Sequence, residues 1–389
     1  MKSAIFILLF FSGIAFSIGI EDYLLLGDFS YTPSIENNGK YMKMLDISAS
    51  FSIIQQSEDR SSVVYDSYDN RMGENTFATS TKMWLRPKNI DAAYRVYGSE
   101  NSANIYAGIS VNRIWQGAYR AIEYQRDASY QVTSSREWIM TGDLYQNGLL
   151  LYAKANQYVD IELKPGYVMG TLTKTYHYMQ TGEDEQTFED AYKAKGIAVN
   201  AVINGHLNNA FHARLGYFLA PLKAEWTKKE PNRTDTVLSD QTFKLPAKAS
   251  FTLIYSPASY FKSSLDVGAD YVFYKNYEFP GKTTADSLKN ALVARMGVTH
   301  FFNEIFNARA GLSFAKSPLC SALDRININI GGHIAVNKNI GLSLEYGHSF
   351  QSFEYGDISG YMPDLYEADE EINFTGNGGN INFSLNYSL

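Results

Sequence analysis

The last eleven residues of the chain constrain its fold most strongly. They read GNINFSLNYSL from Gly379 to Leu389, and every second residue after the glycine is apolar. Only asparagine and serine occupy the positions between them. Because a β-strand points successive side chains to opposite faces, this pattern predicts a strand with one hydrocarbon face and one uncharged polar face. Such a strand fits a soluble sheet with its apolar face inside, or a membrane barrel with its apolar face toward lipid.

Composition favours the membrane barrel. The 389 residues include 29 tyrosines and 23 phenylalanines, but only 19% are charged, whereas soluble proteins carry about 25% charged residues. Tyrosine suits a membrane interface, where its ring lies in lipid and its hydroxyl at the headgroups. A mean hydropathy of −0.25 excludes a polytopic helical membrane protein, but it is compatible with a barrel because lumen residues offset lipid-facing ones. A net charge of −7 disfavours nucleic acid as a partner.

The N-terminus predicts a cleavable secretory signal peptide. Lys2 supplies a short positive region, residues 4–16 are largely apolar, and small residues precede a cleavage site after Ser17. The alternative is an uncleaved anchor helix, which is disfavoured because the apolar run is shorter than the ~20 residues that a spanning helix needs. The chain is therefore expected to divide into a signal peptide (1–17), a short periplasmic segment (18–40) and a barrel (41–389).

Alternating segments recur along the rest of the chain and predict about sixteen strands. The segments are 42–54, 76–86, 90–97, 104–112, 117–127, 148–155, 158–173, 197–203, 211–219, 247–256, 261–275, 290–301, 305–316, 325–336, 340–351 and 379–389. Fourteen strands result if one weak segment is wrong, and eighteen if residues 128–147 form a hairpin. Every second connection is tight, at 87–89, 114–116, 156–157, 207–209, 257–260, 302–304 and 337–339. This sorting predicts short periplasmic turns and mostly long extracellular loops, among them 55–75, 182–190 and 223–245, with the first and last strands paired to close the barrel.

The closing strand also resembles the assembly signal of bacterial outer-membrane β-barrel proteins. That signal has a glycine, alternating hydrophobic residues, an aromatic residue third from the end and usually a terminal aromatic residue. The matching positions are Gly379, Ile381, Phe383, Leu385 and Tyr387, while Leu389 departs from the terminal aromatic. The resemblance, which is to general porins in type but names no single family, implies an all-β, transmembrane, antiparallel up-and-down barrel. It also implies location in the bacterial outer membrane, with outer-membrane lipid and the barrel assembly machinery as partners.

Charged residues that alternate in register are expected to face the lumen, because Lys or Arg on the lipid face costs about 2–4 kcal/mol at the midplane. The candidate pore-lining residues are Arg95, Lys154, Arg214, Asp266, Asp270, Arg295, Arg309, Arg325 and Glu345. Residues 128–147, which carry Arg136, Glu137 and Asp143, occupy the position of the third extracellular loop that folds into the pore of general porins. The alternative is that the charges only solvate a wet interior and pair with neighbours. Their mixed signs predict weak ion selectivity.

These features predict an outer-membrane pore for passive diffusion of small hydrophilic solutes. Two alternatives remain open. One is a transporter for hydrophobic compounds, as in the fatty-acid transporter family, although its N-terminal plug would have to fit within residues 18–40. The other is a non-transporting barrel that serves as an assembly or secretion partner. The sequence contains neither an H-E-x-x-H nor a G-x-S-x-G motif, so we expect no enzyme, no catalytic or metal-binding residues and no cofactor. The oligomeric state is left open, a homo-oligomer included.

Overall fold

The computed structural model describes residues 43–98, 103–127, 129, 131–208, 210–257, 262–278, 288–318, 321, 324–354 and 372–389. The expected signal peptide (1–17) and periplasmic segment (18–40) lie outside these ranges. Among the described residues, no helix is long and apolar enough to cross a membrane.

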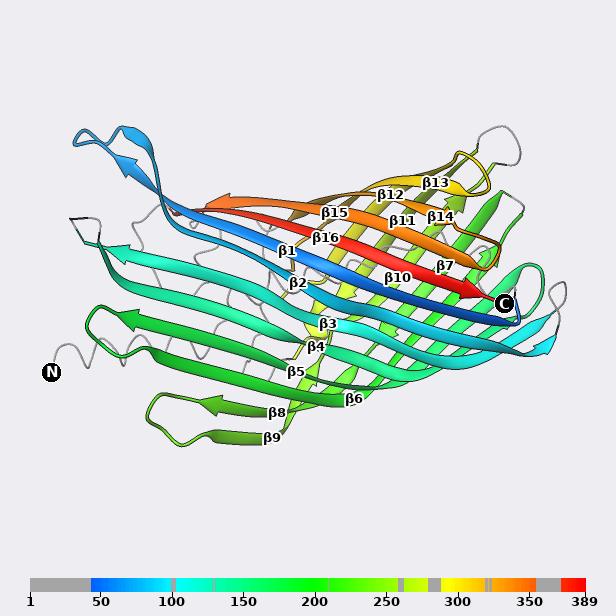
Figure 1. Cartoon of the computed structure of the whole chain (residues 1–389), viewed down its shortest axis with the longest axis horizontal. Coiled ribbons are helices and arrows are strands. Elements are labelled where there is room, and N and C mark those ends of the chain that lie inside the picture. The colour runs from blue at the N-terminus through cyan, green and yellow to red at the C-terminus, as the bar shows by residue number, and fades with distance from the viewer. Residues whose placement is uncertain are drawn as a thin grey trace.

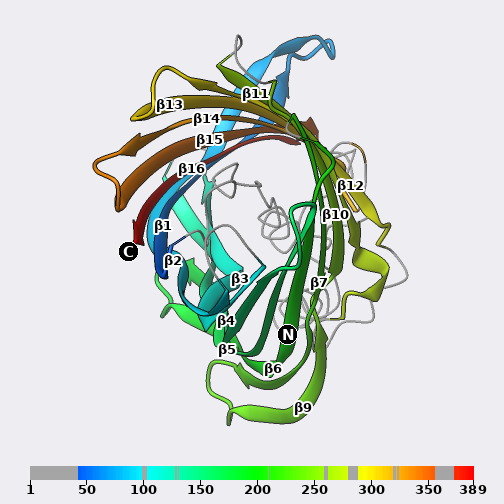
Figure 2. The ribbon, with the colours of Figure 1, turned by 90° about the vertical axis from the view of Figure 1, so that its right-hand side faces the viewer.

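Sixteen strands make up the described structure (Figure 1). They are β1 (Leu45–Tyr65), β2 (Arg71–Gly98), β3 (Asn104–Arg126), β4 (Val132–Lys154), β5 (Val159–Gln180), β6 (Gln186–His206), β7 (Phe211–Leu219), β8 (Pro221–Lys229), β9 (Thr236–Lys244), β10 (Ala247–Tyr255), β11 (Ser263–Phe273), β12 (Ala291–Phe301), β13 (Phe306–Ala315), β14 (Arg325–Ala335), β15 (Ile340–Glu354) and β16 (Ile372–Ser388). A short 3₁₀ helix, η3 (Tyr274–Asn276), follows β11. Fourteen of the strands, all except β8 and β9, pair in a closed antiparallel ring (Figure 2). The predicted all-β barrel is therefore confirmed.

The first and last strands close the barrel, as the alternating C-terminus predicts. Phe51 on β1 lies opposite Phe383 on β16. Beyond the ladder, the carbonyl oxygen of Leu389 accepts hydrogen bonds from the backbone nitrogens of Met44 (2.7 Å) and Leu45 (3.0 Å). Phe383 is 43% exposed, like the other apolar residues of its face, and therefore points to the lipid side. We call the end of the barrel where β1 begins and β16 ends the terminal rim, and the opposite end the far rim.

Two predicted turns are wrong because each is a β-bulge inside one long strand. At 87–89 the register between β1 and β2 skips Lys88, and at 114–116 the register between β3 and β4 skips Ile114. One extra residue in a strand inverts the face to which all later side chains point. At both places the apolar residues therefore switch between odd-numbered and even-numbered positions. A turn between two strands can produce the same switch, so the sequence pattern alone does not distinguish a bulge from a turn. Proline at position 87 fits a bulge, where no ladder hydrogen bond has to be donated.

The long extracellular loops predicted in the first half of the chain are also wrong. Strands β1 to β6 are 21 to 28 residues long, although a membrane strand needs only about 9–11 residues. They continue as polar strands beyond the apolar band, so the segments 55–75 and 182–190 are largely strand rather than loop. Residues 132–147 belong to β4, so Arg136, Glu137 and Asp143 lie in the wall, not on a loop folded into the pore. Polar alternation gives no hydrophobic signal, and the sequence pattern therefore missed these extensions.

The predicted loop at 223–245 instead forms most of a hairpin that leaves the ring. The half of β6 near the far rim pairs with β8, whereas its other half pairs with β7. β9 folds back along β8, and the β8–β9 hairpin projects from the barrel at the lower left of Figure 1. These two strands replace the two that the bulges remove, so the predicted total of sixteen is correct although its members differ.

Candidate functional site

Paired charges lie in the half of the lumen near the terminal rim. Lys164 on β5 lies 2.8 Å from Asp91 of β2 and 3.3 Å from Glu162 of its own strand. All three side chains are at most a tenth exposed. Buried charges need such partners because removing an ion from water costs several kcal/mol. In this part of the lumen, acidic and basic side chains therefore pair with and neutralise each other, rather than lining opposite sides of the lumen as separate groups of like charge.

All nine predicted pore-lining residues lie on barrel strands. Arg95 is on β2, Lys154 on β4, Arg214 on β7, Asp266 and Asp270 on β11, Arg295 on β12, Arg309 on β13, Arg325 on β14 and Glu345 on β15. The structure brings four of them together as two ion pairs, Asp266 with Arg309 at 3.1 Å and Asp270 with Arg295. Arg295 also donates to Thr252 Oγ1 at 3.0 Å. These contacts favour the alternative of mutual pairing, and a role for the nine residues in solute passage stays a prediction.

A buried apolar and aromatic group lies in the middle and far half of the lumen, beside charged side chains. Trp115 on β3 stacks on Tyr277, with ring centroids 6.1 Å apart and 4° between the ring planes. Phe243 of β9 meets the same indole edge-on at 6.5 Å. These rings belong to one buried group that also contains Leu144 and Phe374, and none of the five is more than 5% exposed. We call this group the aromatic cluster. It was not predicted, because its members lie in segments that the sequence pattern assigned to turns and loops.

A cavity with a mixed polar and apolar lining lies beside the aromatic cluster. It has a volume of about 210 Å³, and its lining includes Ser52, Arg113, Trp115, Arg325, Asn327 and Asn380. A smaller one, of about 20 Å³, is lined in part by Asp266, Arg309 and Glu345. Arg325 and Glu345 thus face two different small spaces.

The barrel wall is incomplete between β2 and β3. Their backbone ladder runs from Gly98 opposite Asn104 only as far as Asn89 opposite Asn112. Toward the far rim, β2 pairs only with β1 and β3 pairs only with β4 among the described residues. We call this unpaired half of the contact the seam. Its place follows from the two bulges, since Lys88 and Ile114 interrupt the two strands just where their ladder ends.

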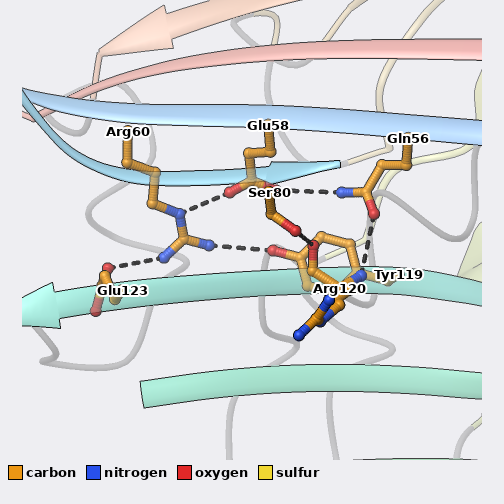
Figure 3. Close-up of polar contacts among 7 residues, drawn as sticks. All are labelled: Gln56, Glu58, Arg60, Ser80, Tyr119, Arg120 and Glu123. Atoms are coloured by element: carbon orange, nitrogen blue, oxygen red, sulfur yellow. Dashed lines mark hydrogen bonds and ion pairs between the residues drawn. The ribbon is translucent and has the colours of Figure 1, made fainter. Parts of the chain in front are cut away.

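Side chains replace the missing ladder along the seam. Ser80 Oγ of β2 donates to the carbonyl oxygen of Arg120 on β3 at 2.7 Å, and the backbone nitrogen of Arg120 donates to Gln56 Oε1 of β1 at 3.0 Å (Figure 3). Nearer the middle, Arg113 Nη2 donates to Ser52 Oγ at 2.6 Å. A side-chain hydrogen bond contributes about 0.5–1.5 kcal/mol, so the seam is held by a few separable contacts.

Arg60 of β1 is the centre of these contacts. Its guanidinium lies 2.6 Å from Glu58 Oε1, 2.9 Å from Glu123 Oε1 and 3.1 Å from the hydroxyl of Tyr119 (Figure 3). The side chain is 1% exposed, and its Cζ also lies 5.4 Å from the ring centre of Trp138. We call Glu58, Arg60, Tyr119 and Glu123 the Arg60 cluster. It connects β1 to β3 across the seam and borders the aromatic cluster.

Comparisons with known proteins bear on the fold. No protein-family model and no curated protein sequence matches the chain. Among solved structures, the Pseudomonas putida toluene transporter TodX is similar with a TM-score of 0.56 and 11% identity, covering 89% of this chain and 90% of that one. A Pseudomonas aeruginosa FadL homologue gives 0.56 and 11%, covering 88% and 90%. The Ralstonia pickettii toluene transporter TbuX gives 0.54 and 11%, covering 89% and 90%. The chain therefore has the fold of bacterial outer-membrane β-barrels, as the resemblance of its closing strand implies.

Proposed function

We propose that this protein is an outer-membrane channel for small hydrophobic compounds, the first alternative left open by the sequence, rather than a pore for hydrophilic solutes. The observation that carries the proposal is the aromatic cluster at inward-facing positions. The lumen of a water-filled pore is polar, whereas sites for small apolar molecules are lined by hydrophobic and aromatic side chains with a few polar groups. The similarity in fold to proteins named as toluene transporters supports the same choice.

The seam is the proposed exit for such a compound. The large cavity is lined by Arg113 and Trp115 and also by Lys88 and Gln116, which lie at the unpaired edges of β2 and β3. A compound that leaves the aromatic cluster through this edge enters the hydrocarbon of the membrane directly. It thereby avoids the ion-paired half of the lumen, where an apolar molecule would have to separate charges such as Lys164 and Asp91. In this arrangement the terminal rim faces the periplasm and the far rim the exterior.

Binding of an apolar compound tests the proposal. Purified protein in detergent is titrated with a fluorescent naphthylamine probe, and toluene is used to displace it. Phe243→Ala should weaken toluene binding about tenfold, because losing most of the contact with one buried ring costs on the order of 1–2 kcal/mol. The matched control is Phe251→Ala, since Phe251 is 46% exposed on the lipid side. Absence of toluene displacement from correctly folded protein, or equal effects of the two substitutions, would contradict the proposal.

A further inference from the structure

Two histidines face each other at the terminal rim of the lumen. His206 ends β6, His212 is the second residue of β7, and the two are directly opposite in the register of that hairpin. Their Nδ1 atoms lie 2.9 Å apart, and the ring planes are inclined by 78°. Because an Nδ1–Nδ1 contact of this length needs a hydrogen on one of the two atoms, one nitrogen donates and the other presents its lone pair.

A carboxylate determines which nitrogen of His206 is available. Asp160 Oδ2 on β5 lies 2.8 Å from His206 Nε2, and Asn204 donates to the other oxygen of the same carboxylate. Asp160 is 6% exposed, whereas the side chain of His206 is 29% exposed, so the carboxylate is buried and the imidazole is partly exposed. A carboxylate at Nε2 holds the proton there and leaves Nδ1 as the free lone pair. Metal-binding histidines commonly have this arrangement, in which a carboxylate orients the ring and raises its basicity.

From this geometry we infer a binding site for a divalent late transition metal, formed by Nδ1 of His206 and Nδ1 of His212. With metal–nitrogen bonds of about 2.0–2.1 Å, two nitrogens 2.9 Å apart subtend about 90° at the metal. That angle joins adjacent positions of a square-planar or tetragonal ion, the geometry that Cu²⁺ and Ni²⁺ prefer, and it is narrow for tetrahedral Zn²⁺. The ion takes the place of the shared hydrogen once neutral His212 carries its proton on Nε2 instead of Nδ1 and each ring tilts slightly, and the bond from His206 to Asp160 is kept.

The protein supplies two ligands and leaves the other positions to water. Among the described residues, no group of three or more His, Cys, Asp and Glu side chains could hold a metal together. Asp160 offsets part of the charge of the ion from behind His206, while Arg214, two residues beyond His212 on the same face, opposes it. We therefore expect a single site of modest affinity, and the site does not depend on whether the channel carries hydrophobic compounds.

Copper and nickel binding to the folded, detergent-solubilised barrel tests this inference. Titration should give one saturable equivalent, and the Cu²⁺ electron paramagnetic resonance spectrum should show two nitrogen ligands. His206→Gln and His212→Gln should each abolish this equivalent. Asp160→Asn should lower the affinity about 10- to 100-fold, as is typical when the partner of a metal-binding histidine is removed.

His333→Gln is the matched control. His333 is a lumen-side histidine of β14, hydrogen-bonded to Ser343 Oγ at 2.9 Å rather than to a second histidine, and its substitution should leave metal binding unchanged. Heat-dependent mobility on gels verifies that each variant is folded. The site is refuted if the wild-type barrel binds neither Cu²⁺ nor Ni²⁺ with a dissociation constant below 1 mM, which corresponds to on the order of 4 kcal/mol of binding energy. It is also refuted if folded His206→Gln binds these ions as tightly as the wild type does. Unchanged affinity in folded Asp160→Asn would overturn the assigned orientation of His206.

Discussion

Truncation of Arg60 should destabilise the barrel strongly, because this side chain is the shared partner of two buried carboxylates. Glu58 and Glu123 are 4% and 5% exposed, and both lie within 3 Å of the guanidinium. Removing one partner of a buried ion pair costs about 3–5 kcal/mol, since the remaining charge is left without compensation. In Arg60→Ala the folding equilibrium should therefore fall by roughly a hundredfold to a few thousandfold.

The structure offers a control pair at the same distance. Arg71 Nη2 lies 2.6 Å from Glu74 Oε1, but both side chains are about half exposed. Exposed ion pairs contribute about 0–1 kcal/mol, so Arg71→Ala should cost much less. Both variants are compared by reversible urea unfolding in lipid vesicles, followed by tryptophan fluorescence.

A compensated variant separates charge from packing. Arg60→Met combined with Glu58→Gln and Glu123→Gln removes the buried charges together and should recover most of the lost stability, since neutral replacement of a buried ionic group is often tolerated. The reasoning fails if Arg60→Ala costs no more than Arg71→Ala, or if the triple variant is no more stable than Arg60→Ala.

Three further predictions concern the bulges, the seam and the far rim. Deletion of Ile114 should prevent folding to the form that resists heat on gels, because the side chains in the far half of β3 would swap between the outer face and the lumen. A one-residue insertion in the β1–β2 turn should leave folding to this form intact. Gln56→Ala should speed amide hydrogen exchange at Arg120 by about 2- to 12-fold, the equivalent of one hydrogen bond of about 0.5–1.5 kcal/mol, and unchanged exchange would show that the seam is not held there. The backbone and side chain of Asn70 donate hydrogen bonds to Asp66 and lower the pKa of its carboxyl group below the ordinary value. The resulting stabilisation of the β1–β2 turn is present above the unfolded-state pKa and is lost as pH falls through the folded-state pKa. Nuclear magnetic resonance should therefore show that acid loosens this turn in the wild type but not in Asp66→Asn.

The sequence predicts the lipid-facing structure well because hydrophobic alternation reports directly on it. The pairing of the first strand with Gly379–Leu389, the β7 segment 211–219 and the tight connections at 156–157, 302–304 and 337–339 all agree with the structure. In these strands one face meets lipid and the other the lumen, so period two is undisturbed.

The candidate site could not be predicted in the same way. Arg60 and Glu58 lie in a polar stretch that reads as a loop, and their strand is recognisable only from its partners on β2 and β16. Trp115 lies next to the bulge at Ile114, where the change of phase resembles a turn. The position of the seam is set by where the backbone ladder between β2 and β3 ends. The sequence of one strand does not specify which residues of its neighbour form hydrogen bonds with it, so the seam could not be predicted.

Parallel measurement of ion conductance and apolar uptake by the same purified protein tests the central claim most directly. In planar bilayers, the folded barrel should give no sustained open-channel steps, because its described lumen is occupied by paired charges and the aromatic cluster. In vesicles, it should speed the entry of toluene relative to protein-free vesicles, and Phe243→Ala should reduce that gain while Phe251→Ala should not. Stable conductance steps together with toluene entry no faster than in protein-free vesicles would contradict the account and restore the hydrophilic pore.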